Sequence, residues 1–136
     1  MSKRETPMIL TFWNSTGGTL ITEYPAVQKS DSCGPRRLDA VIIPAGDHRR
    51  VSWKDVSLEG EDVIVVQAKA GRLGMYLMGQ AVFSAELVKR YHPRSIRSVA
   101  LCYDDDSELH PLLDRFPEVD VVVLGRDEVA DLEVVT

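Results

Sequence analysis

The stretch Val63-Ile64-Val65-Val66-Gln67-Ala68-Lys69 combines an apolar run with an amide and an ammonium group at its end. Four β-branched residues in a row predict a buried strand. Side chains two positions apart on a strand point to the same face, roughly 7 Å from one another, so Gln67 and Lys69 share a face with Val65. Burying a lysine costs free energy unless an anion accompanies it. The stretch therefore predicts a strand that ends at a functional site.

An earlier segment supplies the anion. The apolar run Arg37–Ile43 is interrupted by a single carboxylate, Asp39. If the two segments are neighbouring strands, Asp39, Gln67 and Lys69 gather metal-binding oxygens and a cation at one place, as metal-assisted phosphodiester hydrolysis requires. Simpler alternatives remain open: Asp39 can serve only as a charge partner, Gln67 as a hydrogen-bonding plug, and Lys69 as a strand-end lysine that snorkels to solvent.

The rest of the chain predicts a mixed α/β sheet of about five strands flanked by helices. Strands are predicted at 19–27, 37–43, 63–69, 98–103 and 119–124, and helices at 74–91 and 107–116. The first three strands are expected to form an antiparallel meander, and the long helix to be a parallel crossover between the third and fourth. Segment 8–13 is either a helix turn or a strand, and 49–53 is a candidate for a short extra strand. Ser107 is the expected N-cap of the second helix.

Bulk properties place few limits on function. A length of 136 residues predicts one domain over 1–136, with its core at about 19–124. No apolar run reaches the roughly 18 residues needed to span a membrane, and no signal-peptide pattern is present, so a cytoplasmic protein is expected. The two cysteines fit neither a disulfide framework nor a zinc site.

The net charge of −5 hides an asymmetry along the chain. Residues 1–99 hold fourteen Lys and Arg against ten Asp and Glu, whereas residues 100–136 hold two against eleven. The candidate site lies in the basic part, and a local positive field attracts a polyanion even when the total charge is negative. Several exposed-looking basic residues could bind backbone phosphates, among them Arg36 and Arg37.

These residues and this element order resemble the PD-(D/E)xK nuclease superfamily, which has the restriction-endonuclease-like fold. That family carries an Asp on its second core strand and an acid-x-Lys on its third, followed by a helix and a strand. Asp39 matches the Asp, and Gln67-Ala68-Lys69 matches the acid-x-Lys with Gln in place of the acid. The motif Val66-Gln67-Ala68-Lys69 resembles that of the Mrr-like branch of the superfamily. The resemblance covers about residues 19–103.

The resemblance implies roles for further residues. Asp39 and Gln67 would hold a metal ion together with the backbone carbonyl of Ala68, and Glu23 is the candidate for a second carboxylate. Lys69 would orient the attacking water and stabilise charge on the phosphate. On the long helix, Gln80 is a possible accessory residue. In the same region Ser84 is expected to be packing, whereas Arg72 and Tyr76 are possible phosphate contacts.

The sequence thus predicts a Mg²⁺- or Mn²⁺-dependent endonuclease acting on DNA, with RNA not excluded and a homodimer implied by the resemblance. Because Gln67 replaces a charged ligand by a neutral one, metal affinity should fall unless another carboxylate compensates. The alternative is a nuclease-fold module that has lost turnover and binds nucleic acid or a protein partner. A third reading is a structural α/β domain without either activity.

Overall fold

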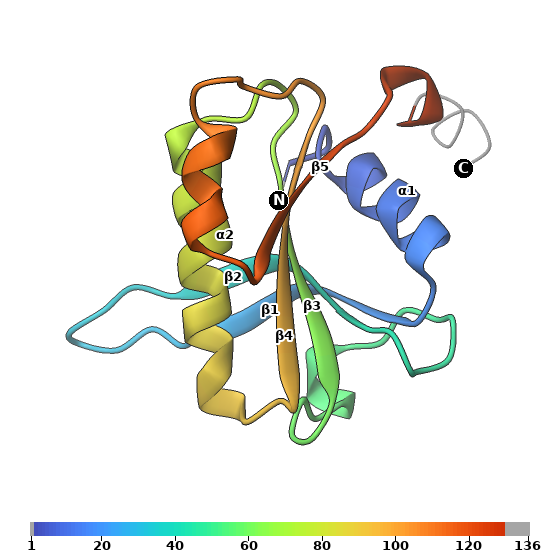
Figure 1. The fold of residues 1–136 in the computed structure, drawn as a ribbon. Coiled ribbons are helices and arrows are strands. Elements are labelled where there is room, and N and C mark those ends of the chain that lie inside the picture. Colours follow the sequence, from blue (N-terminus) through green and yellow to red (C-terminus); the bar gives the residue numbers. More distant parts are fainter. Residues whose placement is uncertain (1, 130–136) are drawn as a thin grey trace.

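The structure is a computed structural model, and it describes residues 2–129 of the chain. A five-stranded sheet lies between two α-helices (Figure 1). The α-helices are α1 (Thr6–Thr16) and α2 (Met75–Val88), and the strands are β1 (Thr19–Val27), β2 (Arg36–Ile43), β3 (Asp62–Ala68), β4 (Ser95–Cys102) and β5 (Val119–Val123). Three short 3-10 helices are η1 (Trp53–Asp55), η2 (Lys89–Tyr91) and η3 (His110–Arg115).

The sheet is mixed, and its spatial order follows the chain from β1 to β5. Strands β1, β2 and β3 pair antiparallel, whereas β3, β4 and β5 pair parallel. This confirms the predicted mixed α/β sheet flanked by helices, with the meander first and the parallel strands after it. The change from antiparallel to parallel pairing occurs at β3, the strand that ends in the candidate motif.

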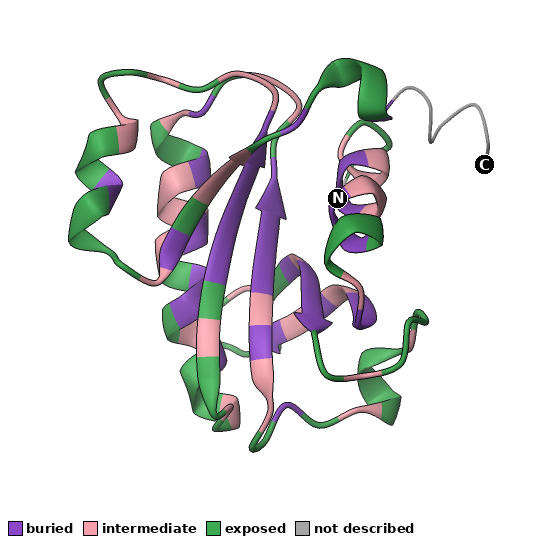
Figure 2. Ribbon diagram, turned by 45° about the vertical axis from the view of Figure 1, so that its right-hand side comes forward, coloured by how far each residue is buried: buried purple, intermediate pink, exposed green. Residues whose placement is uncertain are grey.

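Helices cover both faces of the sheet. Helix α1 packs through Met8, Ile9, Phe12 and Trp13 against one face, and α2 lies on the other. Burial is concentrated in the strands and on the inward sides of both helices (Figure 2). Residues of β3 alternate between these two cores, which explains why the strand reads as a continuous apolar run.

Segment 8–13 lies within α1, because Pro7 occupies the first turn of a helix that extends to Thr16. The segment 49–53 forms no strand; Arg50 makes only an isolated bridge with Leu20. The long helix is shorter than predicted, since its last turn, Lys89–Tyr91, tightens into η2 before the left-handed His92.

The predicted N-cap at Ser107 is wrong. The short helix η3 begins later, at His110, and Leu109 precedes it without a side-chain cap. The carboxylate of Asp106 instead accepts hydrogen bonds from the backbone N–H groups of Glu108 (3.0 Å) and Leu109 (2.9 Å). An Asp one position earlier therefore satisfies the free backbone donors of this turn. In residues 2–129, no helix has the length and apolar character needed to cross a membrane.

Candidate functional site

The structure brings Asp39 and Gln67 together where the pairing of β2 and β3 ends. Regular pairing runs from Ile42 opposite Ile64 to Ala40 opposite Val66. Beyond it, side chains replace backbone groups as hydrogen-bond acceptors. The Asp39 carboxylate accepts from the N–H of Ala68 at 3.0 Å, and the Gln67 amide oxygen accepts from the N–H of Asp39 at 3.4 Å. The two strands are thus held together by the candidate site residues themselves.

Gln67 is fixed at both ends of its amide group. It is only 2% exposed. Its Nε2 donates to the Ser84 hydroxyl on α2 at 2.7 Å, while its Oε1 faces the backbone of β2. Ser84, which the sequence suggested was only packing, is therefore the residue that orients Gln67. Gln67 thus has the purely hydrogen-bonding role that was left open as an alternative above. To bind a metal ion, its amide oxygen would have to give up the hydrogen bond from the Asp39 N–H.

Asp39 carries a partly buried carboxylate whose pKa is set by opposing effects. Burial raises the pKa of Asp39 above its usual value. The hydrogen bond from Ala68 and the positive charge of the amino terminus oppose this rise, and the negative charges of Glu23 and Glu5 add to it. Among residues 2–129, no Lys, Arg or His forms an ion pair with Asp39. The alternative in which Asp39 is a charge partner for Arg36, Arg37 or Lys69 is therefore not what the structure shows.

Glu23 lies in β1 between Thr22 and Tyr24, which pair with Ala40 and Leu38. This register places it across from Asp39, and its charge contributes to the raised pKa of Asp39. Its backbone has a φ of 53°, a left-handed conformation that costs free energy in any residue other than glycine. The strand is thus distorted at the residue that faces Asp39.

Glu5 is a carboxylate at this site that the sequence did not single out. It occupies the N-cap position of α1, and its Oε2 accepts a hydrogen bond at 3.2 Å from the N–H of Ala70, just after β3. Its Oε1 accepts from the Ser2 hydroxyl. The available signal was weak: Ser2-x-x-Glu5 ahead of Pro7 marks a helix start, but nothing local indicates that this helix begins beside β3.

Lys69 is exposed and directly follows the last residue of β3, so the strand ends one residue before the predicted position. Its backbone N–H donates to Leu101 on β4 at 3.0 Å, which fixes the start of its side chain. Its ammonium group has no hydrogen-bond or ion-pair partner within the described part of the chain. A positive charge is therefore available to an anion from solvent.

Gln80 and Gln67 line the same open groove. The groove has a volume of about 640 Å³ and runs between the first residues of β2 and the outer side of α2. Gln67 and Ser84 line it together with Gln80 and Tyr76. The helix glutamine and the strand glutamine thus border one solvent-filled space.

The metal-binding capacity of the site is modest. In the described residues, no three His, Cys, Asp or Glu side chains are gathered closely enough to hold a metal ion. The negative charges of Glu5 and Glu23 help to raise the pKa of Asp39, and a cation bound among the three carboxylates would lower it. Because Mg²⁺ binds through one or two carboxylates and keeps several waters, the carboxylates present would suit only a weakly held ion.

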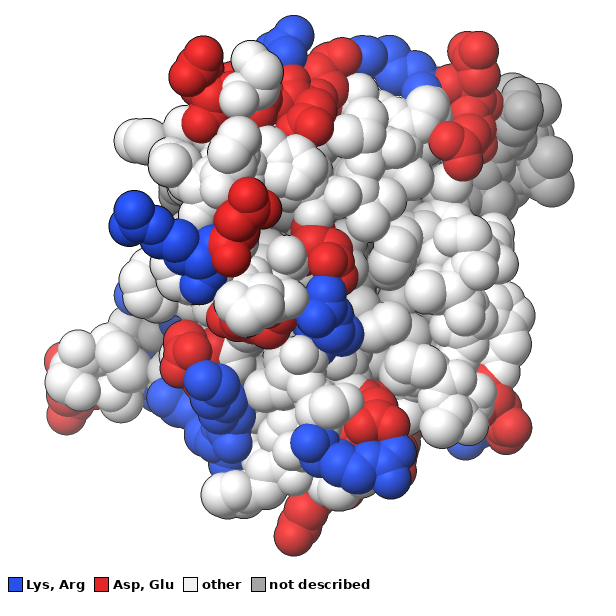
Figure 3. Space-filling model, in the orientation of Figure 1, with Lys and Arg blue, Asp and Glu red and all other residues white. Residues whose placement is uncertain are grey.

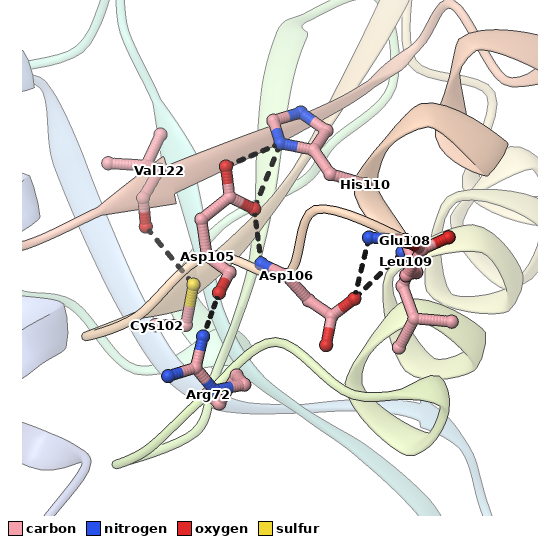
Figure 4. Close-up of polar contacts among 8 residues, drawn as sticks. All are labelled: Arg72, Cys102, Asp105, Asp106, Glu108, Leu109, His110 and Val122. Atoms are coloured by element: carbon pink, nitrogen blue, oxygen red, sulfur yellow. Dashed lines mark hydrogen bonds and ion pairs between the residues drawn. The ribbon is translucent and has the colours of Figure 1, made fainter.

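A second polar cluster lies at the carboxyl end of β4 (Figure 4). His110 Nδ1 contacts the Asp105 carboxylate at 2.8 Å, and Arg72 donates to the Asp105 backbone carbonyl. The hydrogen bond with His110 holds the pKa of Asp105 below its usual value. Asp104 is paired with Arg126 at 2.8 Å. Arg72 is therefore held by this loop, and its role as a phosphate contact stays a prediction.

Surface charge does not by itself mark a nucleic-acid interface. On the face that carries α2 and β5, acidic and basic side chains are interspersed (Figure 3). Three arginines, Arg94, Arg97 and Arg126, are neutralised by aspartates. Comparison with known proteins adds no assignment: no protein-family model, no curated protein and no solved structure matches this chain.

Proposed function

We propose that the chain is a metal-dependent nuclease that hydrolyses DNA phosphodiester bonds, with the site formed by Asp39, Gln67 and Lys69. The observation that carries the proposal is the junction of β2 and β3, where the half-buried carboxylate of Asp39 lies beside the Gln-x-Lys sequence at the end of the next strand. The mixed sheet with this junction at its centre is the arrangement that the resemblance to the PD-(D/E)xK superfamily implies.

Each residue has a distinct task in this proposal. Asp39 would hold Mg²⁺ or Mn²⁺ together with the carbonyl of Ala68, and Glu23 or Glu5 would supply the second carboxylate. The ion supplies Lewis-acid activation of water and phosphate when bound. Gln67, held by Ser84, fixes the backbone of β2 so that the Asp39 carboxylate stays at the strand junction. Lys69 places its free ammonium where it can stabilise negative charge on the phosphate.

The test is cleavage of supercoiled plasmid and of single-stranded DNA with Mg²⁺ and with Mn²⁺. We expect Asp39→Asn and Lys69→Ala each to lower the cleavage rate by at least about 100-fold. Asn retains an acceptor for the Ala68 N–H, so loss of activity cannot be attributed to loss of that hydrogen bond. The matched control is Lys54→Ala, an exposed lysine in η1 at the other end of the sheet (Figure 1).

Retained cleavage in both purified variants would contradict the proposal, as would equal loss in Lys54→Ala. Circular dichroism and melting temperature of each variant establish that the fold is intact. Metal dependence is checked by adding EDTA, which should stop cleavage by the wild-type protein.

One observation favours a second candidate, a nuclease-fold module that binds nucleic acid or a protein without turnover. Gln67 is buried with both ends of its amide bonded, so it offers no free ligand. Gln67→Glu distinguishes the two. In the impaired module, the new carboxylate should create metal binding and cleavage that the wild-type protein lacks. In the active nuclease, wild-type cleavage is already present and metal dependent.

The remaining parts of the proposal follow from the resemblance. A homodimer would allow two sites to cut two strands, and light scattering at several concentrations measures it. RNA is an alternative substrate, tested with an oligonucleotide of the same sequence. A cytoplasmic location completes the proposal.

A further inference from the structure

The groove beside Gln67 has the composition of a nucleotide-binding surface. Its volume of about 640 Å³ falls within the roughly 300–1,000 Å³ typical of ligand sites. Arg36 and Arg37 line one wall, and Tyr76 and Phe83 from α2 line the other. Its lining contains no Asp or Glu, although the chain as a whole has a net charge of −5.

The two arginines are available to an anion. Arg36 donates only to the backbone carbonyl of Pro35, at 3.1 Å, and Arg37 has no side-chain partner among residues 2–129. Elsewhere the structure pairs Arg94, Arg97 and Arg126 with aspartates. The groove therefore holds uncompensated positive charge beside the strand junction, and this charge is complementary to a phosphate backbone.

The aromatic wall is unusually open to solvent. Tyr76 is 79% exposed and Phe83 is 67% exposed. They are seven residues apart on α2, so they lie on the same side of the helix two turns apart, with Gln80 between them. A Cβ atom added at Gly79 would meet nothing within 4 Å, which leaves open space beside both rings.

We infer that this groove binds an unpaired stretch of nucleic acid, with bases stacked on Tyr76 and Phe83 and phosphates bound by Arg36 and Arg37. Exposed rings can stack only on bases that are not already stacked in a duplex, so the groove selects single-stranded or flapped substrates. Gln67 lines the groove and accepts a hydrogen bond from the N–H of Asp39, so a bound strand would border the junction of β2 and β3. This inference rests on the proposed nuclease function and names its substrate class.

The experiment is fluorescence anisotropy with labelled oligonucleotides of about 16 nucleotides in EDTA, where no cleavage occurs. We expect the single strand to bind more tightly than the blunt duplex of the same sequence. Tyr76→Ala and Phe83→Ala should each weaken single-strand binding about tenfold, whereas Tyr76→Phe, which keeps the ring, should not. DNA and RNA strands of one sequence show which of them the groove prefers.

Gly79→Leu separates occlusion from unfolding. It should fill the groove and weaken binding while leaving the melting temperature unchanged or higher, because leucine favours a helix over glycine by roughly 0.5–1 kcal/mol. The matched control is Leu112→Ala. Leu112 is an apolar residue that is 53% exposed. It lines a neighbouring groove formed by α2 and η3 and does not line this one. Its binding should equal that of the wild-type protein.

Three outcomes would overturn the inference. The first is equal affinity for duplex and single strand, and the second is wild-type binding by both Tyr76→Ala and Gly79→Leu. The third is a lack of oligonucleotide binding together with self-association that Phe83→Ala abolishes. The last would assign the exposed rings to a contact between copies. Failure here is distinct from failure of the nuclease proposal. If binding depends on Tyr76 and no cleavage occurs, the groove binds nucleic acid but the nuclease proposal fails. If cleavage depends on Lys69 but not on Tyr76, the nuclease proposal stands and the inference about the groove fails.

Discussion

At the scale of single residues, the site is organised by side chains that satisfy backbone groups. Asp39 and Gln67 each accept a hydrogen bond from the opposite strand, and Ser84 fixes the second end of the Gln67 amide. These bonds explain why polar residues are tolerated at the end of two apolar strands, since a buried polar group is stable when it is hydrogen-bonded. The negative charge of Asp39 is compensated only in part, since burial keeps its pKa above the usual value.

That charge predicts a stability cost with a defined pH dependence. Because burial raises the pKa of Asp39 in the folded state, folding favours the protonated form. The cost of Asp39 is therefore absent below the pKa of the unfolded chain and appears in full as pH rises through the folded pKa. We expect Asp39→Asn to raise the melting temperature at pH 7 by about 3 °C, and the difference to shrink toward pH 4.

Calorimetry of both proteins between pH 4 and pH 8 checks this expectation. A variant less stable than the wild-type protein at every pH would contradict it, because the Asp39 charge would then be stabilising. Addition of Mg²⁺ provides a second readout: the wild-type protein should gain stability and the variant should not, since ligand binding stabilises only the protein that binds.

Ser84→Ala tests the orientation of Gln67. Removal of the hydroxyl leaves the buried Nε2 without an acceptor, and an unsatisfied buried donor costs about 1–3 kcal/mol. We expect Ser84→Ala to lower the free energy of unfolding by that amount in urea denaturation. The matched change is Ser107→Ala at an exposed position, which should leave it unchanged. Equal stability of the two variants would mean that Gln67 is not held by Ser84.

At the scale of elements, the end of a strand or helix depends on which side chain reaches its free backbone groups. The turn before η3 is closed by Asp106, whose carboxylate accepts from two backbone N–H groups. The end of β3 is similarly closed by Asp39 and Glu5, which accept from Ala68 and Ala70. In both places an acid holds a loop near the carboxyl edge of the parallel strands.

Asp106→Ala should therefore destabilise the protein by about 1 kcal/mol, as the loss of a capping carboxylate does in other turns and helix ends. The exposed Ser107, which the sequence favoured as the cap, provides the comparison through Ser107→Ala. Urea denaturation of the two variants measures the difference. If Ser107→Ala proves the more destabilising change, the hydrogen bonds of this turn are not as the structure has them.

At the scale of the whole molecule, the net charge is negative, but basic side chains without ion-pair partners gather near the junction of β2 and β3. Several arginines are neutralised by aspartates, whereas Arg36, Arg37 and Lys69 have no ion-pair partner in residues 2–129. These three flank the strand junction from β2 and β3. We therefore expect this protein to bind nucleic acid through a small number of phosphate contacts and not to bind along its whole length.

Salt dependence measures that number of contacts. With three phosphates neutralised, the logarithm of the single-strand binding constant should fall against the logarithm of salt concentration with a slope of about −2. Arg37→Ala should reduce the magnitude of this slope by about 0.7, whereas Arg94→Ala, which removes an arginine already paired with Asp62, should not. A slope that Arg37→Ala does not change would show that the groove does not bind the backbone.

The sequence by itself determined the mixed sheet and the closeness of Asp39 and Gln67. Alternating and continuous apolar patterns specify strands and a helix locally, and three consecutive strands without a helical crossover between them favour antiparallel pairing. Within that sheet the register of β2 against β3 follows from matching apolar residues, so an Asp and a Gln near the ends of neighbouring strands meet.

Only the tertiary structure decided the surroundings of these two residues. Glu5 reaches the site because α1 packs across the sheet, and Ser84 reaches Gln67 because α2 packs on the opposite face. The groove exists because the start of β2 and the outer side of α2 leave a space between them. Such contacts join residues far apart in the chain through side-chain packing, and no local pattern of apolar and polar residues encodes them.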